Sequence, residues 1–303
     1  MARVLITGIQ GFTGPYVARA VESAGHEACG TEPWPNFDLS RPASLAAAIE
    51  SARPDYVVHL AGLSSVTHAD AAELYAANAV GTGNLLQAIA DTAPGVRKVL
   101  LASSANVYGN CDAYPIDEQT PPAPVNHYGC SKLSMEFIAR AWFDRLPIVI
   151  TRPFNYTGPG QTEAFLIPKL VAHYAERRPV LELGNIEVER DFSDVRMLAD
   201  AYVKLLIAGD AGIVVNVCSG VGRSVRSVMA ELKAMTGHEP QLRVAPHLVR
   251  RVEVHRLIGS NSTLRRIIGT CVHTDFTETL RWMVEDRRRP SVAQPAATSR
   301  PRA

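Results

Sequence analysis

Short apolar runs alternate with helix-like patterns along the first half of the chain. Runs of strand length lie at residues 4–6, 27–30, 56–60, 98–102 and 147–151. Between them, apolar residues recur at helical spacing at 15–24, 44–52, 71–92 and 128–144. Strands that are largely apolar and separated by helices predict an α/β fold with a doubly wound parallel sheet, covered on both faces. Gly81 or Gly83 marks where the long helix at 71–92 would break.

After about residue 155 this regular alternation is lost. Short strands, loops and two helices, near 163–177 and 224–236, predict a smaller C-terminal α/β lobe. We therefore assign residues 1–155 to the sheet domain, with later segments returning to it, and 156–285 mainly to the lobe. Residues 286–303 are rich in Arg, Ala, Pro and Ser, so a disordered tail is expected there, with a basic tether as the alternative.

The composition gives no sign of a polyanionic partner. Of 303 residues, 47% are hydrophobic, and 31 Lys and Arg residues against 30 Asp and Glu residues leave a net charge of +1. Neither nucleic acid nor an anionic membrane is expected from this balance. No apolar segment approaches the ~18 residues that span a bilayer, and the N-terminal run is too short for a signal peptide, so we expect a cytoplasmic protein.

The five cysteines are scattered and contain no C-x-x-C pair. An odd, scattered set argues against a disulfide framework or a zinc site, so no metal is expected and a reducing compartment fits. Cys130 is either a reactive thiol or a small space-filling residue, and the absence of a neighbouring histidine in the sequence favours the second.

The segment Thr7–Gly14 has the pattern of a nucleotide-binding turn. Gly8, Gly11 and Gly14 follow a strand and open a helix, with Phe12 and Thr13 between them. Glycine allows a tight turn and a close backbone approach, and the helix N-terminus offers N–H groups to a diphosphate. The segment therefore predicts dinucleotide binding, with a glycine-rich turn that binds nothing as the alternative.

The end of the second strand selects between NAD and NADP. Glu32 lies 18 positions after Gly14, where a carboxylate would accept hydrogen bonds from the adenosine ribose and repel a 2′-phosphate. With no arginine before Arg41, the sequence favours NAD(H) over NADP(H). Asp38 is placed either to bind the adenine amino group or to cap the helix that starts near Ser40.

Tyr128 and Lys132 lie four residues apart in a predicted helix, on one face. A free phenol titrates near ~10, and a nearby ammonium group favours the phenolate. The pair is therefore expected to be a tyrosine whose pKa is lowered for proton transfer. Beside a nucleotide cofactor, proton transfer suggests hydride chemistry.

Four motifs together resemble the extended short-chain dehydrogenase/reductase family, over roughly residues 2–285. They are Thr7–Gly14, Ser103–Gly109, Tyr128-x-x-x-Lys132 and Arg152–Asn155. The resemblance implies a Rossmann fold in which Ser104 holds the substrate oxygen, Tyr128 exchanges the proton, and Lys132 binds the nicotinamide ribose and lowers the pKa of Tyr128. It also implies cofactor contacts from Asp38, Leu39, Leu60, Ala61, Gly62, Asn78 and Pro153.

Within the family the chain is similar to enzymes that act on nucleotide sugars. In the run 183–195, Arg190 resembles the arginine that pairs with the nucleotide-sugar diphosphate. Arg250 and Glu253 resemble a second clamp, for phosphate and ribose, and Asn106 and Asn155 are further substrate candidates. Surface ion pairing is the alternative for both arginine segments.

The two residues after Ser104 distinguish the reactions of the family. Sugar 4,6-dehydratases of this family carry carboxylates there, as the extra acid and base that dehydration needs. This chain has Ala105 and Asn106, and neither accepts a proton at neutral pH. Dehydration is therefore disfavoured unless Asp117 or Glu118 reaches the site from the following loop.

The runs 152–161 and 183–192 most resemble the GDP-4-dehydro-6-deoxy-mannose reductases, which make GDP-rhamnose or GDP-6-deoxytalose. The resemblance implies a reductase, with a 4-epimerase that retains tightly bound NAD as the enzymatic alternative. A non-catalytic NAD(P)-binding sensor is a third, disfavoured because the whole trio is intact. A homodimer formed through the helices at 71–92 and 128–144 is also implied.

Overall fold

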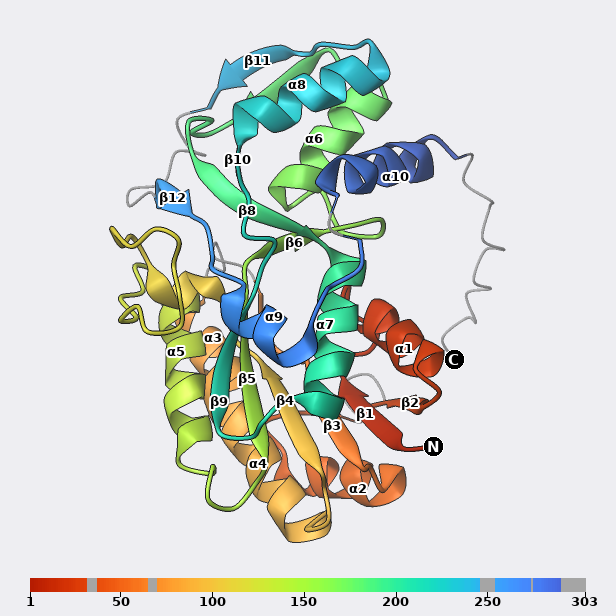
Figure 1. The fold of residues 1–303 in the computed structure, drawn as a ribbon, viewed down its shortest axis with the longest axis vertical. Helices are drawn as coiled ribbons and strands as arrows, with labels where there is room; N and C mark the ends of the chain where they lie inside the picture. The colour runs from red at the N-terminus through yellow and green to blue at the C-terminus, as the bar shows by residue number, and fades with distance from the viewer. Residues whose placement is uncertain (32–36, 65–69, 246–253, 274, 290–303) are drawn as a thin grey trace, which may run out of the picture.

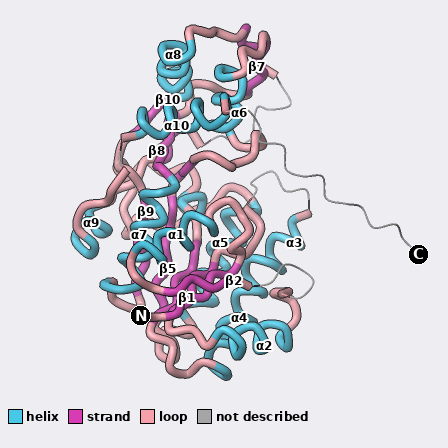
Figure 2. Tube along the Cα trace, turned by 90° about the vertical axis from the view of Figure 1, so that its right-hand side faces the viewer, coloured by secondary structure: helices cyan, strands magenta, loops and turns pink. Residues whose placement is uncertain are grey.

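A computed structural model describes residues 1–31, 37–64, 70–245, 254–273 and 275–289 of the chain. The chain folds into a larger lobe with a central sheet and a smaller lobe above it (Figure 1). In a view turned by 90°, α6, α8 and α10 again lie at the end of the molecule opposite α2 and α4 (Figure 2). The two lobes are therefore stacked along the long axis.

The large lobe is built on a six-stranded sheet in which all neighbours are parallel. From edge to edge its strands are β2 (Glu27–Gly30), β1 (Arg3–Thr7), β3 (Tyr56–His59), β4 (Lys98–Ala102), β5 (Ile148–Pro153) and β9 (Ile213–Val217). The chain order reverses between β1 and β3. In such folds this switch point opens a crevice at the carboxyl ends of the strands.

Helices cover both faces of this sheet, as the apolar strands predict. One face carries α1 (Gly14–Ser23), α7 (Val195–Ala208) and α9 (Ser262–Ile268). The other face carries α2 (Pro42–Ala52), α4 (Gly81–Thr92) and α5 (His127–Arg140). The doubly wound fold expected from the sequence is confirmed.

Alternate strand residues supply the two cores. In β1, Val4 and Ile6 belong to the core under α1 and α7, and Leu5 belongs to the core under α2 and α4. The same alternation holds in β3, where Val57 and Val58 face opposite sides. Full burial of each such side chain contributes roughly 1.5–3 kcal/mol. The sheet is thereby fixed on both sides, and its carboxyl edge becomes a rigid platform.

The smaller lobe has its own sheets, helices and core. Its strands are β6 (Asn155–Thr157), β8 (Glu189–Asp194), β10 (Gly222–Ser224) and β12 (Arg256–Leu257), with β7 (Val180–Leu183) and β11 (Gln241–Val244) as a separate pair. The helices α6 (Leu166–Ala175), α8 (Val225–Thr236) and α10 (Phe276–Arg288) close its core. Phe192 and Phe276 stack within it, with ring centroids 5.6 Å apart.

The long helix expected at 71–92 is divided into three parts. An α-helix, α3 (Ala71–Tyr75), runs into a π-helical turn, η1 (Ala76–Val80), and α4 begins at Gly81. Gly81 lies so close to Leu39 that an added Cβ would stand 2.7 Å from the Cβ of Leu39. The helix does not break near Gly81, contrary to the prediction, but changes there from π-helical to α-helical, and the π turn places Asn78 in the interior.

Several elements differ from the sequence prediction. The helix expected to reach residue 144 ends at Arg140 and continues as turns, whose Trp142 and Phe143 pack against the core of the sheet. The helix α7 was not anticipated, although Arg196, Asp200 and Lys204 form a partly exposed polar stripe along its otherwise largely buried surface. With β9 it forms the segment that returns to the large lobe. The helix α10 reaches Arg288, so its last turn extends into the predicted tail, whose remaining residues 290–303 lie outside the described ones.

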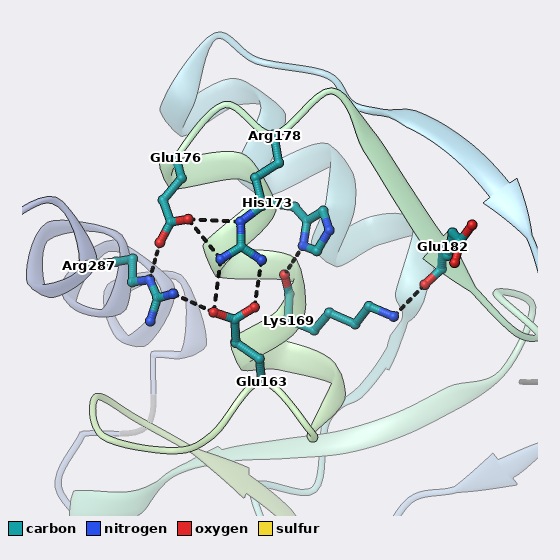
Figure 3. Close-up of polar contacts among 7 residues, drawn as sticks. All are labelled: Glu163, Lys169, His173, Glu176, Arg178, Glu182 and Arg287. Carbon is teal, nitrogen blue, oxygen red and sulfur yellow. Dashed lines mark hydrogen bonds and ion pairs between the residues drawn. The ribbon is translucent and has the colours of Figure 1, made fainter.

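A ring of ion pairs fastens the end of α10 to α6 (Figure 3). Arg178 contacts Glu163 at 2.6 Å and Glu176 at 2.8 Å, and Arg287 of α10 contacts the same two carboxylates. Hydrogen bonding with Arg178 holds the pKa of Glu163 below its usual value. Burial alone would raise the pKa of Glu176, but its hydrogen bonds with Arg287 and Arg178 lower it overall.

We expect Arg287→Gln to lower the free energy of unfolding at pH 7 by about 1 kcal/mol, because the ring is half-exposed and screened by water. The pKa values of both carboxylates are lower in the folded state. Their stabilisation is therefore present above the unfolded-state pKa and is lost as the pH falls through the folded-state pKa. Urea titrations at pH 7 and at acid pH should show the difference shrinking, and 1 M salt should also reduce it. Arg288→Gln, with the same change of charge, is the control, and an equal loss in both variants would contradict the role of the ring.

Candidate active site

The glycine turn packs so closely against neighbouring backbone that side chains could not be accommodated at two of its glycines. Gly8 has φ +70°, and an added Cβ there would lie 2.9 Å from the backbone nitrogen of Ala61. A Cβ on Gly14 would lie 2.2 Å from the carbonyl oxygen of Ile9. The turn delivers the N-terminus of α1 to the carboxyl edge of the sheet, an arrangement that binds phosphate groups. The residues present therefore fit the diphosphate of a dinucleotide.

A buried histidine joins the ends of β1 and β3 to α4. His59, at the end of β3, contacts the hydroxyl of Thr7 at 2.7 Å and that of Thr82 at 3.0 Å. Burial, with a smaller effect from the charge of Lys132, lowers its pKa to about 3, so it is neutral. Thr7 also accepts a hydrogen bond from the backbone N–H of Ala61. The predicted cofactor residues after β3 are thereby fixed to β1.

Asn78 connects the loop after β3 to α5, the helix that carries Tyr128 and Lys132. Its amide oxygen accepts from the backbone N–H of Leu63, and its nitrogen donates to the carbonyl of Leu63 and to Ser131 of α5. A Cβ on Gly62 would lie 2.5 Å from the Asn78 oxygen and 3.9 Å from the Lys132 ammonium. Gly62, Asn78 and Lys132 are therefore neighbours, as the predicted cofactor site requires.

Ser104 and Tyr128 come together at the carboxyl end of β4. Ser104 follows the strand directly, and Tyr128 lies in the first turn of α5 and is 8% exposed. Burial raises the pKa of Tyr128 to about 12, although its hydrogen bond with Ser104 acts in the opposite direction. The phenol is therefore protonated at neutral pH and has a proton to donate.

The expectation that Lys132 lowers the pKa of Tyr128 is wrong for this structure. The Lys132 ammonium donates a hydrogen bond of 2.9 Å to the carbonyl oxygen of Ala102. Burial lowers the pKa of Lys132 itself to about 8, with the charge of Glu136 opposing this shift. Desolvation of the phenol outweighs any help from a lysine that is itself desolvated.

The loop after Ser104 carries no acid or base into the site. Ala105 is buried, and Asn106 donates hydrogen bonds to the Ser104 hydroxyl from its backbone at 3.2 Å and from its side chain at 3.1 Å. Asp117 accepts hydrogen bonds from Gln119 and Thr120 in its own turn. Asn106, predicted to bind substrate, here orients Ser104.

A buried ion pair joins α5 to β5. Arg152 donates to both carboxylate oxygens of Glu136, at 2.9 and 2.6 Å, and the two side chains are 2% and 1% exposed. Glu136 also accepts a hydrogen bond of 2.6 Å from Ser103. Because Glu136 lies on the same helical face as Lys132, one carboxylate joins α5, β5 and the residue before Ser104.

The same network continues to the edge strand β9 and to α9. Arg152 donates to the Tyr108 hydroxyl at 3.0 Å, and this hydroxyl donates to Asn216 of β9 at 2.7 Å. Glu118 accepts from the backbone N–H of Asn216 and from Thr263 of α9. Glu118 therefore joins segments from both halves of the chain and does not act as the extra acid of a dehydratase.

Two of the predicted substrate residues, Asn155 and Arg190, lie on strands of the smaller lobe. Asn155 is exposed at the start of β6, and Arg190 is buried on β8, where it donates to the carbonyls of Glu189 and His255.

Three predicted cofactor residues lie elsewhere in the fold. Pro153 ends β5, and Leu39 accepts a hydrogen bond from Asn84. Asp38 accepts from Ser40 in a local turn. Three further predictions, Glu32, Arg250 and Glu253, lie outside the described residues.

Two residues of the site were missed from the sequence. Glu136 follows Lys132 by four positions, and a carboxylate on the otherwise buried face of a helix is a signal for a buried partner. Tyr156 contacts the glycine turn: its hydroxyl lies 2.9 Å from that of Thr13, and its ring stacks on Phe12. Only its place directly after Asn155 could have indicated it.

Within the described part of the chain, no group of three or more His, Cys, Asp or Glu side chains is placed to hold a metal ion. None of the helices there is both long and apolar enough to cross a membrane. All five cysteines are free thiols.

We expect Glu136→Gln to lower the free energy of unfolding by about 3–5 kcal/mol, because it leaves Arg152 buried without a full counter-charge. Urea unfolding at pH 7 measures this loss. Glu187→Gln is the matched control, since Glu187 pairs with Arg226 at the surface, where each side chain is 67% exposed. A loss no larger than that of the control would show that the buried pair does not hold the helix in place.

Curated relatives resemble the chain over most of its length. The GDP-6-deoxy-D-talose 4-dehydrogenase of Aggregatibacter actinomycetemcomitans is 33% identical over 270 residues, which cover 88% of this chain and 91% of that protein. The GDP-6-deoxy-D-mannose reductase of Pseudomonas aeruginosa is 35% identical over 297 residues, 94% of this chain and 96% of that protein.

Solved structures share the fold. The structure of RMD from Pseudomonas aeruginosa complexed with NADPH has a TM-score of 0.86 and 34% identity, covering 95% of this chain and 99% of that one. A chain from Burkholderia cenocepacia J2315, described as a candidate epimerase, has a TM-score of 0.88 and 46% identity, covering 95% and 98%. Residues 4–218 match the NAD dependent epimerase/dehydratase family. The motifs, the parallel sheet and these likenesses agree, and the chain belongs to the NAD dependent epimerase/dehydratase family.

Proposed function

We propose that the protein is an NAD(P)-dependent reductase acting on the C4 ketone of a nucleotide-linked 4-keto-6-deoxyhexose. GDP-4-dehydro-6-deoxy-mannose is the substrate we favour, with GDP-rhamnose or GDP-6-deoxytalose as the product. One observation carries the proposal: a protonated, buried Tyr128 beside Ser104, with no carboxylate following that serine. The similarity to a GDP-6-deoxy-D-mannose reductase over 94% of the chain supports the substrate class.

In this mechanism the chain binds the sugar ketone and supplies its proton. The nicotinamide cofactor, when bound, supplies the hydride. Ser104 donates a hydrogen bond to the substrate oxygen, and the Tyr128 phenol gives its proton to that oxygen as negative charge develops there. Burial keeps Tyr128 protonated until that charge appears. Lys132, Asn78 and Gly62 lie together where the nicotinamide ribose would bind.

Dehydration is a poor fit to the same site. Removing a C5 proton and expelling the C6 hydroxyl require an additional acid and base. Asn106 orients Ser104, and Glu118 is engaged with Asn216 and Thr263. The side chains next to the serine therefore support transfer of a single proton.

A nucleotide-sugar 4-epimerase with tightly bound NAD is the second candidate. The 46% identity to the Burkholderia chain described as a candidate epimerase favours it. The same three residues would serve, because an epimerase also moves one proton and one hydride. The two functions differ in an observable way, since an epimerase retains its coenzyme and a reductase consumes it.

The choice of coenzyme and the division of the chain belong to the same proposal. Glu32 favours NAD(H), whereas the structure of RMD, at 34% identity, contains NADPH. We infer that residues 1–155 with α7 and β9 bind the coenzyme and that residues 156–285 mainly bind the nucleotide sugar. The free thiols support a reducing, cytoplasmic location.

We expect rapid loss of nicotinamide absorbance when the protein is mixed with GDP-4-keto-6-deoxymannose and NADH or NADPH. Comparing the two coenzymes decides the preference, and NMR of the product gives the C4 configuration. Tyr128→Phe is the control: it should bind the coenzyme normally and lose at least ~10²-fold in turnover, because the proton donor is gone. Absence of oxidation with either coenzyme would contradict the GDP-sugar reductase, and bound NAD in the purified protein would favour the epimerase.

We also propose that the protein is a homodimer formed through α5 and the helices α3, η1 and α4. Phe137 on α5 is 63% exposed and Val80 on η1 is 57% exposed, although both are large apolar residues. In a monomer each would leave apolar surface in water, and a two-fold axis would cover both copies at once.

Phe137→Glu should therefore yield a monomer, because it places two like charges at the centre of a symmetric interface. Light scattering on a size-exclusion column measures the mass. Val244→Glu is the control, since Val244 is 61% exposed on β11 in the other lobe. A monomeric unaltered protein, or a Phe137→Glu variant that remains dimeric, would contradict this interface.

A further inference from the structure

Thr13 stands at the N-cap of α1 but does not cap the helix with its side chain. An N-cap hydroxyl normally accepts a hydrogen bond from the second or third residue of the helix. Here the second residue is Pro15, which has no N–H, and the N–H of Tyr16 donates to the carbonyl of Thr13. The Thr13 hydroxyl is therefore available for another contact.

Tyr156, on β6 of the smaller lobe, makes that contact. The two hydroxyls share a hydrogen bond of 2.9 Å, although the residues are 143 positions apart. The Tyr156 ring also stacks on Phe12, with centroids 6.1 Å apart and planes 12° from parallel. Two adjacent residues of the predicted diphosphate turn thus contact one side chain of β6.

A second contact joins the same two segments. Tyr16, in the first turn of α1, donates a hydrogen bond of 2.7 Å to the carbonyl of Pro159, three residues after Tyr156. Its ring meets the edge of Trp282 of α10 at 6.0 Å. The glycine turn is therefore fastened to the smaller lobe at β6, at the following loop and at α10.

The strand β6 continues this connection to the proposed sugar-binding strand. It pairs in parallel with β8, with Tyr156 opposite Ser193, and β8 also carries Arg190. Asn155, a predicted substrate residue, directly precedes Tyr156. One side chain thus lies between the turn for the coenzyme and the strands for the substrate.

We propose that Tyr156 is a positioning residue: through Thr13 and Phe12 it holds the glycine turn in the conformation that binds the coenzyme diphosphate, and it fixes that turn relative to the substrate strands. The inference rests on the proposed function only in requiring a dinucleotide coenzyme. Tyr156 acts through other residues and does not itself exchange a proton with the substrate.

The test measures coenzyme binding without turnover. Titration of the full-length protein with NADPH and with NADH, followed by nicotinamide fluorescence, gives a Kd for the coenzyme that binds more tightly. We expect Tyr156→Phe to raise this Kd by roughly 3- to 10-fold, the effect of one neutral hydrogen bond. Tyr56→Phe removes a hydroxyl from the first residue of β3, at the amino end of the strand and away from the glycine turn, and should leave the Kd unchanged.

A double-mutant cycle identifies the partner. Thr13→Val removes the other hydroxyl, and the variant with both changes should bind no more weakly than the weaker single variant, because the two side chains share one interaction. Additive losses would overturn the link between Thr13 and Tyr156. An unchanged Kd in Tyr156→Phe, with or without a lower melting temperature, would show that the residue only stabilises the fold.

Steady-state kinetics separate this inference from the proposed function. With a productive keto-sugar, Tyr156→Phe should raise KM for the coenzyme and leave kcat within a few-fold, unlike Tyr128→Phe. If no keto-sugar is reduced, the reductase proposal fails and the binding cycle still decides the role of Tyr156. If neither NADPH nor NADH binds the unaltered protein, both proposals fall.

Discussion

The buried ion pair between Glu136 and Arg152 is the interaction on which the geometry of the site depends. It joins the helix that carries Tyr128 and Lys132 to strand β5, and Ser103 attaches the end of β4 to the same carboxylate. A charged pair that is almost fully buried is costly to desolvate, so its value lies less in stability than in geometry. Because the Arg152 guanidinium binds both carboxylate oxygens of Glu136, the two side chains can pair in few other relative orientations. The distance between the serine and tyrosine hydroxyls is therefore set by groups that do not touch the substrate.

The sheet supplies a frame and the polar networks determine how the parts are placed on it. Apolar alternation fixes the strands between two layers of helices, and buried polar side chains then link these strands to the loops and helices around them. Tyr108 and Asn216 extend the network of Arg152 toward β9, and Glu118 adds a contact to α9. On the other side of the crevice, Tyr156 and Tyr16 join the glycine turn to β6 and its loop. Specific contacts thus hold β9 and α9 on one side of the site and the glycine turn and β6 on the other.

Local patterns predicted what local physics determines. The apolar strands predicted the parallel sheet, and the glycine spacing predicted the turn. Gly81 indicated where the long helix changes its geometry. The helix α7 was missed although Arg196, Asp200 and Lys204 recur at four-residue spacing, because this polar stripe is narrow and the rest of the helix is largely buried. The pairing of Glu136 with Arg152 depends on how α5 packs on β5, and that of Thr13 with Tyr156 depends on how the two lobes meet. No spacing rule in the sequence gives such contacts.

The electrostatics of the trio also required the structure. From spacing alone, a lysine one turn from a tyrosine predicts a lowered phenol pKa. Burial acts on both groups at once: it raises the pKa of Tyr128 to about 12 and lowers that of Lys132 to about 8. Each shift disfavours the charged form, so the pair is neutral or singly charged rather than a phenolate–ammonium pair. A ketone that becomes an alkoxide needs a donor that is still protonated when the charge develops. Burial keeps the proton on Tyr128 until an alkoxide, which is the stronger base, develops beside it.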